Sequence, residues 1–578
     1  MHLIDWIVLA GTLATIVGYG VWKTKSVKNT ESFLLGDRQL KWWTIGLSIM
    51  ATQASAITFL STPGKAYQDG MGFAQFYFGL PIAMVFLAAF VLPHFYRLKV
   101  YTAYEFLEGR FDRRTRQLTA FFFLLQRGLA AGLTIFAPAI ILSSILGWDL
   151  QITNLFIGVV VIFYTVMGGT NAVSQTQKQQ MILILSGMIV AALIAAWRLP
   201  QGVQVGDALS LAGKLGKMEI VDTGFSWDNR YNIWTGIFAS TFLFLSYFGA
   251  DQSQVQRYLS GRTLTESRLG LLFNGIIKVP MQFLVLFTGL IVFILFQFEK
   301  PPLHFNEVNV AIVESAEPDQ LQELETAHQR AFNAKREAVE AFVNARESGN
   351  FMAQEEAVSS MKTQAALMAE QEATFKSLLK QTEPKARERD GDYIFITFVM
   401  RYLPVGLVGL LLAVIFSAAM SSTASEINAL ATATVVDFYR RSWAPGRSDG
   451  HYLWASKAFT IVWGMIALFF AAVADLFDNL VEAVNIVGSV FYGSILGIFL
   501  VAFFFKQIRA RAVFFAALVA EGAVVLLYFL NSSNPEVYPM TYLWLVPVGC
   551  MLVIILGYLF QMLDGGLGRG SSAPKVKP

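Results

Sequence analysis

Long apolar runs recur along this chain, and short polar segments separate them. An apolar helix of roughly twenty residues crosses the hydrocarbon core of a bilayer, which is about 30 Å thick. The pattern therefore predicts an all-α polytopic membrane protein with about thirteen transmembrane helices. We expect these helices near 3–22, 42–65, 71–96, 118–146, 150–168, 178–197, 233–252, 270–297, 401–438, 452–474, 480–505, 511–530 and 541–562.

Composition supports this class, since 55% of the 578 residues are hydrophobic, only 15% are charged, and the mean hydropathy is +0.51. The first run follows Asp5 and has no small-residue cleavage site, so we expect a retained helix and not a removed signal peptide. A single cysteine, Cys550, excludes an internal disulfide and a thiolate metal site.

Charge in the connecting loops predicts the orientation. Basic residues gather in alternate, odd-numbered loops, which the positive-inside rule places in the cytoplasm. We therefore expect the amino terminus outside and the carboxyl terminus in the cytoplasm, in a plasma (inner) membrane. These loops also account for the net charge of +3, so it indicates membrane orientation and no nucleic-acid partner. The basic loops lie near 23–41, 97–116, 257–268, 440–447 and 506–511.

One segment, 315–385, does not have a membrane composition. It is rich in Ala, Glu, Gln and Lys, with sparse apolar residues at helical spacing, and Gly349 divides it. We predict an extracellular hairpin of two helices that is structural or that contacts a partner protein. The hairpin has no nucleophile paired with a base and no histidine cluster, so we expect no catalysis there. No nucleophile and base recur together elsewhere, so the sequence predicts a protein that is not an enzyme.

The ninth span carries two adjacent hydroxyls, Ser421 and Ser422, in an otherwise apolar stretch. Hydroxyl oxygens are suitable ligands for a hard cation, and Ala418, Ser421 and Ser422 share one helix face. The alternative is that these serines allow close helix packing or bond back to their own backbone.

Two other spans contain interruptions. The second places Gly46, a polar centre and Pro63 within one crossing, and the seventh has Gly249 followed by Ala250 and Asp251. Paired broken helices indicate a transporter built from inverted repeats with its site near the midplane. We expect one repeat over 41–200 and the other over 233–505, the hairpin interrupting the second. An additional helix over 1–30 precedes them, and two helices with a cytoplasmic tail over 511–578 follow.

Five motifs carry a family resemblance. They are YTAYEFLEGRF at 101–111, IFAPAIIL at 135–142, FYTVMGG at 163–169, VQRYLSGRT at 255–263 and SSTASEINAL at 421–430. Together they are similar to the sodium/solute symporter family, which includes sodium/glucose, sodium/iodide, sodium/monocarboxylate and multivitamin cotransporters, and they are nearest the iodide and monocarboxylate branch. The resemblance implies a LeuT-type five-plus-five inverted repeat that couples inward sodium movement to solute uptake by alternating access.

The resemblance also implies a sodium site between the second and ninth spans. Its ligands would be the carbonyls of Ala51, Ala54 and Ala418 and the hydroxyls of Ser421 and Ser422. Carbonyls at a helix break are free to turn toward an ion, which is consistent with such a site.

The chain departs from the family at Gln177, where sodium-coupled members often carry an acid. Lys178 adjoins it, and Glu426 lies one turn beyond Ser422 inside a span, where an acid is costly unless it is paired or solvated. Glu426 either lines the exit path of the ion, pairs with Lys178 to hold an inner gate, or reaches an aqueous vestibule.

For the solute, the pattern of the sugar branch is only partly kept. Lys278 matches that branch, and Asn485 stands where glutamine is usual. Thr58, Tyr77 and Phe244 replace polar sugar contacts. The resemblance therefore implies a site in which a sugar fits poorly.

Two further residues point to the solute. Tyr247 resembles the aromatic that closes over the solute from the inside. Arg127 lies about nine residues, or roughly 14 Å, into the fourth span, which is near the midplane. Its planar fork suits a carboxylate, and the alternative is an internal partner such as Glu426. We expect a sodium-coupled carboxylate symporter; the alternatives are a sodium/sugar symporter, a proton-coupled transporter and a transporter-like sensor.

Overall fold

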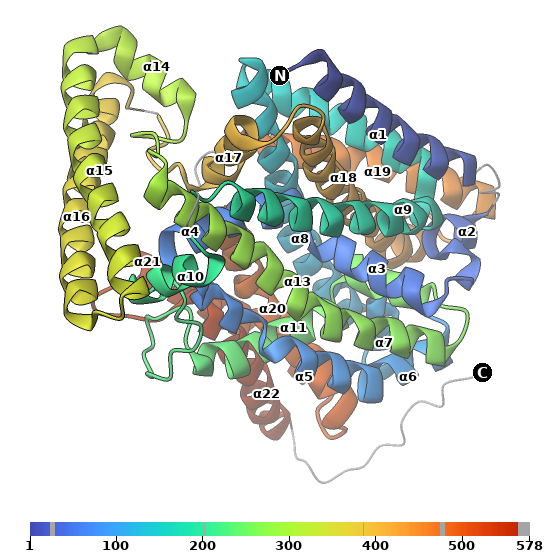
Figure 1. Cartoon of the computed structure of the whole chain (residues 1–578). Coiled ribbons are helices and arrows are strands. Elements are labelled where there is room, and N and C mark those ends of the chain that lie inside the picture. The colour runs from blue at the N-terminus through green and yellow to red at the C-terminus, as the bar shows by residue number, and fades with distance from the viewer. Residues whose placement is uncertain (24–28, 201–202, 385, 474–479, 565–578) are drawn as a thin grey trace.

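The computed structural model describes residues 1–23, 29–200, 203–384, 386–473 and 480–564. The regular elements of the described part are helices, and its one β-bridge joins Leu40 and Gly261. Figure 1 shows a body of packed helices, with two long helices, α15 and α16, standing along one side. The tail after 564 and residues 24–28, on which part of the orientation argument falls, lie outside the described residues.

Ten helices of the described chain are long and apolar enough to cross a membrane, and one bent helix pair makes an eleventh candidate. Two shorter apolar helices, Leu3–Ile16 and Thr235–Gly249, occupy the first and seventh predicted spans. The fold class is therefore confirmed, while the count of thirteen crossings stays a prediction. The ten are Met71–Leu98, Arg113–Ile140, Leu150–Met167, Val173–Trp197, Leu264–Phe298, Leu407–Trp443, Asp449–Ala472, Ala483–Phe504, Ala510–Ser533 and Tyr542–Leu563.

The bent pair is the second predicted span. Helix α3 (Trp42–Gln53) and helix α4 (Ala56–Asp69) meet at 62°, because Ala54 leaves the helical region with φ −87° and ψ 76°. The seventh span is interrupted in the same way, since α11 (Ser240–Gly249) ends before Ala250 and Asp251, and α12 (Gln252–Leu259) begins after them. Both interruptions expose backbone groups inside the body, where polar ligands can reach them.

Helix α18 (Leu407–Ala433), which carries the two adjacent serines, runs through the centre of the body. It packs against α1 (Leu3–Lys23), α3, α8 (Arg113–Leu146) and α9 (Leu150–Trp197), and nearly all of its side chains are buried. The centre of the molecule therefore holds many hydroxyls that must find partners inside the protein.

Helix α9 covers two predicted spans, the fifth and the sixth. It turns at Gly169, whose φ of +56° is a conformation that favours glycine, and a Cβ there would lie 2.8 Å from the Phe33 carbonyl oxygen. The helix can therefore change direction at this point only with a residue that has no side chain.

Helices α15 (Pro318–Glu347) and α16 (Phe351–Thr382) pack side by side and turn at Gly349, where φ is +70°. Near this turn two ion pairs, Arg346–Asp207 at 3.0 Å and Lys214–Glu355 at 2.5 Å, join the helix pair to α10 (Val205–Lys214). These ion pairs therefore hold the Gly349 end of the α15–α16 pair against α10.

The other helices complete the body around these elements. Within it, α13 (Leu264–Phe298) packs along α3 and α4, and α20 (Leu480–Phe504) packs on α8, α11 and α22. The rest are α2 (Thr30–Leu35), α5 (Gly79–Phe86), α6 (Leu92–Leu98), α7 (Ala103–Arg110), α14 (Glu307–Ala316), α17 (Ile394–Tyr402), α19 (Asp449–Ala472), α21 (Ala510–Ser533) and α22 (Leu545–Leu563).

Candidate functional site: a central pocket with a buried arginine

A pocket lies where the broken helices meet α8, α18 and α20. Five of the six residues that we predicted to contact the solute line it, and they come from segments far apart in the sequence. These five are Thr58, Tyr77, Arg127, Tyr247 and Asn485.

The lining of the pocket contains both aromatic and polar residues. Phe76, Tyr77 and Phe244 contact one another, with ring centroids 5.1 to 5.9 Å apart. Thr52 and Gln53, at the end of α3, supply polar groups next to the helix break. Such a lining suits a small solute with an apolar body and a polar end.

Lys278, the sixth predicted contact, does not line this pocket. Its ammonium lies 5.9 Å from the ring centroid of Tyr77, which does line the pocket. The side chain is completely buried, and within the described chain Nζ has no hydrogen-bond acceptor. A direct contact between Lys278 and the solute stays a prediction, and it would require the Tyr77 side chain to move.

The five predicted sodium ligands lie on α3, at its carboxyl-terminal end, and on α18. All five residues are buried, and the Ser421 hydroxyl donates to the Ala51 carbonyl across the two helices at 3.3 Å. The Ser422 hydroxyl donates to the Ala418 carbonyl at 3.0 Å, within its own helix. Ala54 stands at the helix break itself, with non-helical dihedrals. One contact thus joins the two helices at Ser421, while Ser422 bonds back to its own backbone; the assignment of the five as sodium ligands stays a prediction.

Gln177 is the hub of a buried hydrogen-bond network just beyond Ser421. Its amide nitrogen donates to the Ser421 carbonyl at 3.2 Å, to the Ser425 hydroxyl at 2.7 Å and to the Thr52 hydroxyl at 3.1 Å, and its oxygen accepts from Ser48. A neutral amide therefore ties α9 to α3 and α18, where an acid is frequent in the family that the sequence resembles.

Lys178 and Glu426 do not pair with each other among the described residues. The Lys178 ammonium lies 4.6 Å from the ring centroid of Trp43, while the two Glu426 oxygens contact Arg127 and Thr134. The Lys178–Glu426 pair that we considered as an inner gate is therefore absent among the described residues, and Glu426 contacts α8 through Arg127 and Thr134. Helix α9 carries Lys178 away from the face that bears Glu426.

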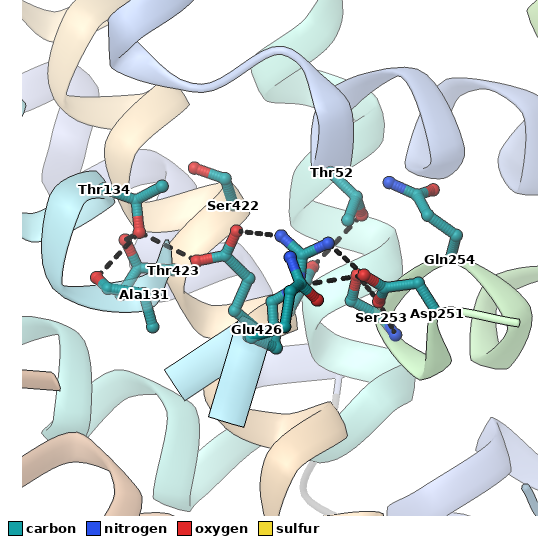
Figure 2. Close-up of polar contacts among 12 residues, drawn as sticks. Thr52, Ala131, Thr134, Asp251, Ser253, Gln254, Ser422, Thr423 and Glu426 are labelled. Carbon is teal, nitrogen blue, oxygen red and sulfur yellow. Dashed lines mark hydrogen bonds and ion pairs between the residues drawn. The ribbon is translucent and has the colours of Figure 1, made fainter. Parts of the chain in front are cut away.

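Arg127 has internal partners, which was the alternative to a direct solute contact. Its Nε lies 3.0 Å from Asp251 Oδ2, one Nη2 hydrogen also reaches Asp251, and Nη1 lies 3.1 Å from Glu426 Oε1. Nη2 also donates to the Tyr492 hydroxyl at 2.7 Å, and the guanidinium carbon lies 5.3 Å from the Tyr247 ring centroid. The guanidinium therefore contacts both acids, Asp251 and Glu426, which Figure 2 labels.

Asp251 and Tyr492 are functional candidates that the sequence argument missed. Asp251 is an acid at a break inside a span, and the rule that selected Glu426 selects it equally. Tyr492 lines the pocket and donates to Asp251 Oδ2 at 2.9 Å, but a tyrosine in an apolar span gives no comparable signal in the sequence.

A bundle of membrane-spanning helices, two of them broken around a central polar pocket, defines the transporter class with inverted repeats. The model of the Sodium:solute symporter family matches residues 33–319 and 362–520. This chain belongs to that family, and the family resemblance drawn from its motifs is confirmed.

Individual relatives agree. The sodium-coupled monocarboxylate transporter 2 of Mus musculus is 26% identical over 97% of this chain and 84% of its own length. The human sodium/iodide cotransporter is 34% identical over 47% of this chain and 42% of its own length. A solved structure described as a substrate-bound, outward-open Na⁺-coupled sialic acid symporter matches with a TM-score of 0.74 at 21% identity, covering 97% of this chain and 98% of that one. It supports the fold.

Proposed function

We propose that the solute of this sodium-coupled symporter is a small organic carboxylate, which the protein imports by alternating access. The observation that carries the proposal is the position of Arg127, a buried guanidinium that lines the central pocket. A guanidinium presents several fixed N–H donors and matches a carboxylate better than any other side chain does. The protein is a transporter of its family and not an enzyme.

The aromatic wall supports the same solute class. Phe76, Tyr77 and Phe244 line the pocket together with Arg127 and would offer apolar surface to the body of the solute. Relatives named for monocarboxylate transport are consistent with this arrangement.

Sodium is the co-transported ion, and we place it between α3 and α18. Carbonyls of Ala51, Ala54 and Ala418 and the hydroxyls of Ser421 and Ser422 would supply neutral oxygens, which suit a monovalent hard cation. The Ser422 hydroxyl would have to turn from the Ala418 carbonyl, a change of one rotamer.

The protein spans a bilayer several times, and the finer topology follows from its charge pattern. We place the amino terminus outside, the basic loops in the cytoplasm and the α15–α16 hairpin outside, in a plasma (inner) membrane. Repeats over 41–200 and 233–505 would then each begin with a broken helix. The hairpin's outer face is a candidate contact for a partner protein.

The test uses matched pairs of ligands. Purified protein is heated in sodium or in choline with acetate, propionate, lactate or pyruvate, and with the neutral amides propionamide and lactamide. We expect carboxylates alone to raise the melting temperature, and only in sodium.

Variants then assign the effect to one residue. Arg127→Lys should lose carboxylate binding almost as fully as Arg127→Ala, because an ammonium keeps the charge but not the fork. Arg336→Lys, on the exposed hairpin, is the control. Stabilisation by amides or neutral sugars in place of carboxylates would refute the proposed solute class.

A further inference from the structure

The two acids that contact Arg127 are held very differently. Asp251 accepts from Nε and Nη2 of Arg127, from the Tyr492 hydroxyl, and from the backbone amide and hydroxyl of Ser253, five donors in all. It also caps the amino terminus of α12, where the helix dipole favours a negative charge. Asp251 is therefore a complete counter-ion for Arg127.

Glu426 has far fewer partners. Oε1 accepts from Arg127 Nη1 at 3.1 Å, and Oε2 accepts from the Thr134 hydroxyl at 2.8 Å. An ionised carboxylate accepts about four hydrogen bonds, so Glu426 is only partly satisfied. With Asp251 already neutralising the guanidinium, Glu426 is the surplus negative charge of the cluster.

The two acids also differ in where they lie. Arg127 and Glu426 both line the pocket, whereas Asp251 is absent from its lining. The contact between Arg127 Nη1 and Glu426 Oε1 is therefore an ion pair whose two residues both line the pocket.

We propose that Glu426 is an internal competitor that takes the place of the solute carboxylate at Arg127 Nη1 and is displaced when the solute binds. Asp251 keeps the guanidinium oriented throughout. This inference rests on the proposed carboxylate solute, and it assigns Glu426 a role in setting affinity.

The same arrangement connects the solute to sodium. Glu426 lies four residues, or about 6 Å along the helix axis, after Ser422 on α18. A sodium ion bound at Ser421 and Ser422 places a positive charge beside Glu426 and weakens the attraction between Glu426 and Arg127. Sodium therefore makes Nη1 easier for the solute to occupy, which is a coupling free energy between the two sites.

The test is a gain of binding. In Glu426→Gln the competitor keeps its shape but loses its charge, so we expect carboxylate affinity to rise roughly tenfold, the effect of one charge-assisted hydrogen bond. The ratio of affinities in sodium and in choline should also fall, because Glu426 no longer transmits the charge of the ion. Propionate and lactate are the probes, and titration calorimetry measures both quantities.

Two further variants keep the result interpretable. Glu521→Gln removes another buried carboxyl, on α21 and away from the pocket, and should behave as wild type. Glu426→Asp withdraws the carboxylate by one methylene and should also bind carboxylates more tightly. It replaces Glu426→Gln as the test if that variant does not fold.

The outcomes separate the two proposals. Wild-type protein that binds no carboxylate in sodium overturns the solute class and this inference together. Wild-type protein that binds carboxylates, with equal or weaker binding in folded Glu426→Gln and Glu426→Asp, overturns this inference alone, since a structural or ion-path glutamate predicts that loss.

Discussion

Replacing Ser421 by alanine should raise the sodium concentration needed for half-maximal solute uptake. In the structure the Ser421 hydroxyl faces the Ala51 carbonyl across the α3–α18 boundary at 3.3 Å, so the substitution removes one oxygen from the proposed ion shell. A contact with a charged group is worth about 1.5 to 3 kcal/mol. That free energy corresponds to a rise in half-saturating sodium of roughly 10-fold to 150-fold.

Folding should be affected much less than ion binding. The hydroxyl bond is long, so its loss should lower the free energy of unfolding by about 1 kcal/mol or less. The melting temperature in choline should therefore stay near the wild-type value, while the additional stabilisation by sodium shrinks.

The assay is sodium-dependent uptake of a radiolabelled carboxylate into proteoliposomes, with Ser417→Ala as the matched control. Ser417 is one turn earlier on α18 and completely buried, and its hydroxyl has no partner within the described chain. An unchanged sodium response in Ser421→Ala, or an equal loss in Ser417→Ala, would refute the placement of the ion.

Three further outcomes are expected. Replacing 318–382 with a short flexible linker should preserve sodium-dependent uptake in proteoliposomes, because the proposed sites lie in the membrane body; loss of uptake by folded protein would make the hairpin part of a gate. Burial lowers the pKa of His328 to about 4, below its ordinary value of 6.5, so the stability it contributes is full above pH 6.5 and is lost as the pH falls toward 4. Melting curves between pH 4 and 7 should show a smaller acid effect in His328→Leu, and equal curves would contradict this. Gln177→Leu should lower the free energy of unfolding by roughly 2–4 kcal/mol, since it strands several buried hydroxyls, and a wild-type melting temperature would show that the network adds little.

The candidate site was predictable in part, and its residues show where the limit lies. Ser421 and Ser422 stood out because adjacent hydroxyls are unusual in an apolar span. Gly249, followed by Ala250 and Asp251, likewise marked a break that can be recognised within one segment. Lys278 was placed by family position alone, and packing behind Tyr77 separates it from the pocket lining. Sequence therefore located the elements of the site more reliably than it located the side chains that line it.

The sequence by itself determined the membrane class, the positions of the apolar helices and the two broken helices, because hydrophobic length and helix-breaking residues act within one segment. Only the tertiary structure decided the partners of Arg127. Asp251 and Glu426 are 124 and 299 residues away from it along the chain, and three helices must pack before their charges meet. A buried charge takes whichever partner packing brings within reach, and no local pattern encodes that choice.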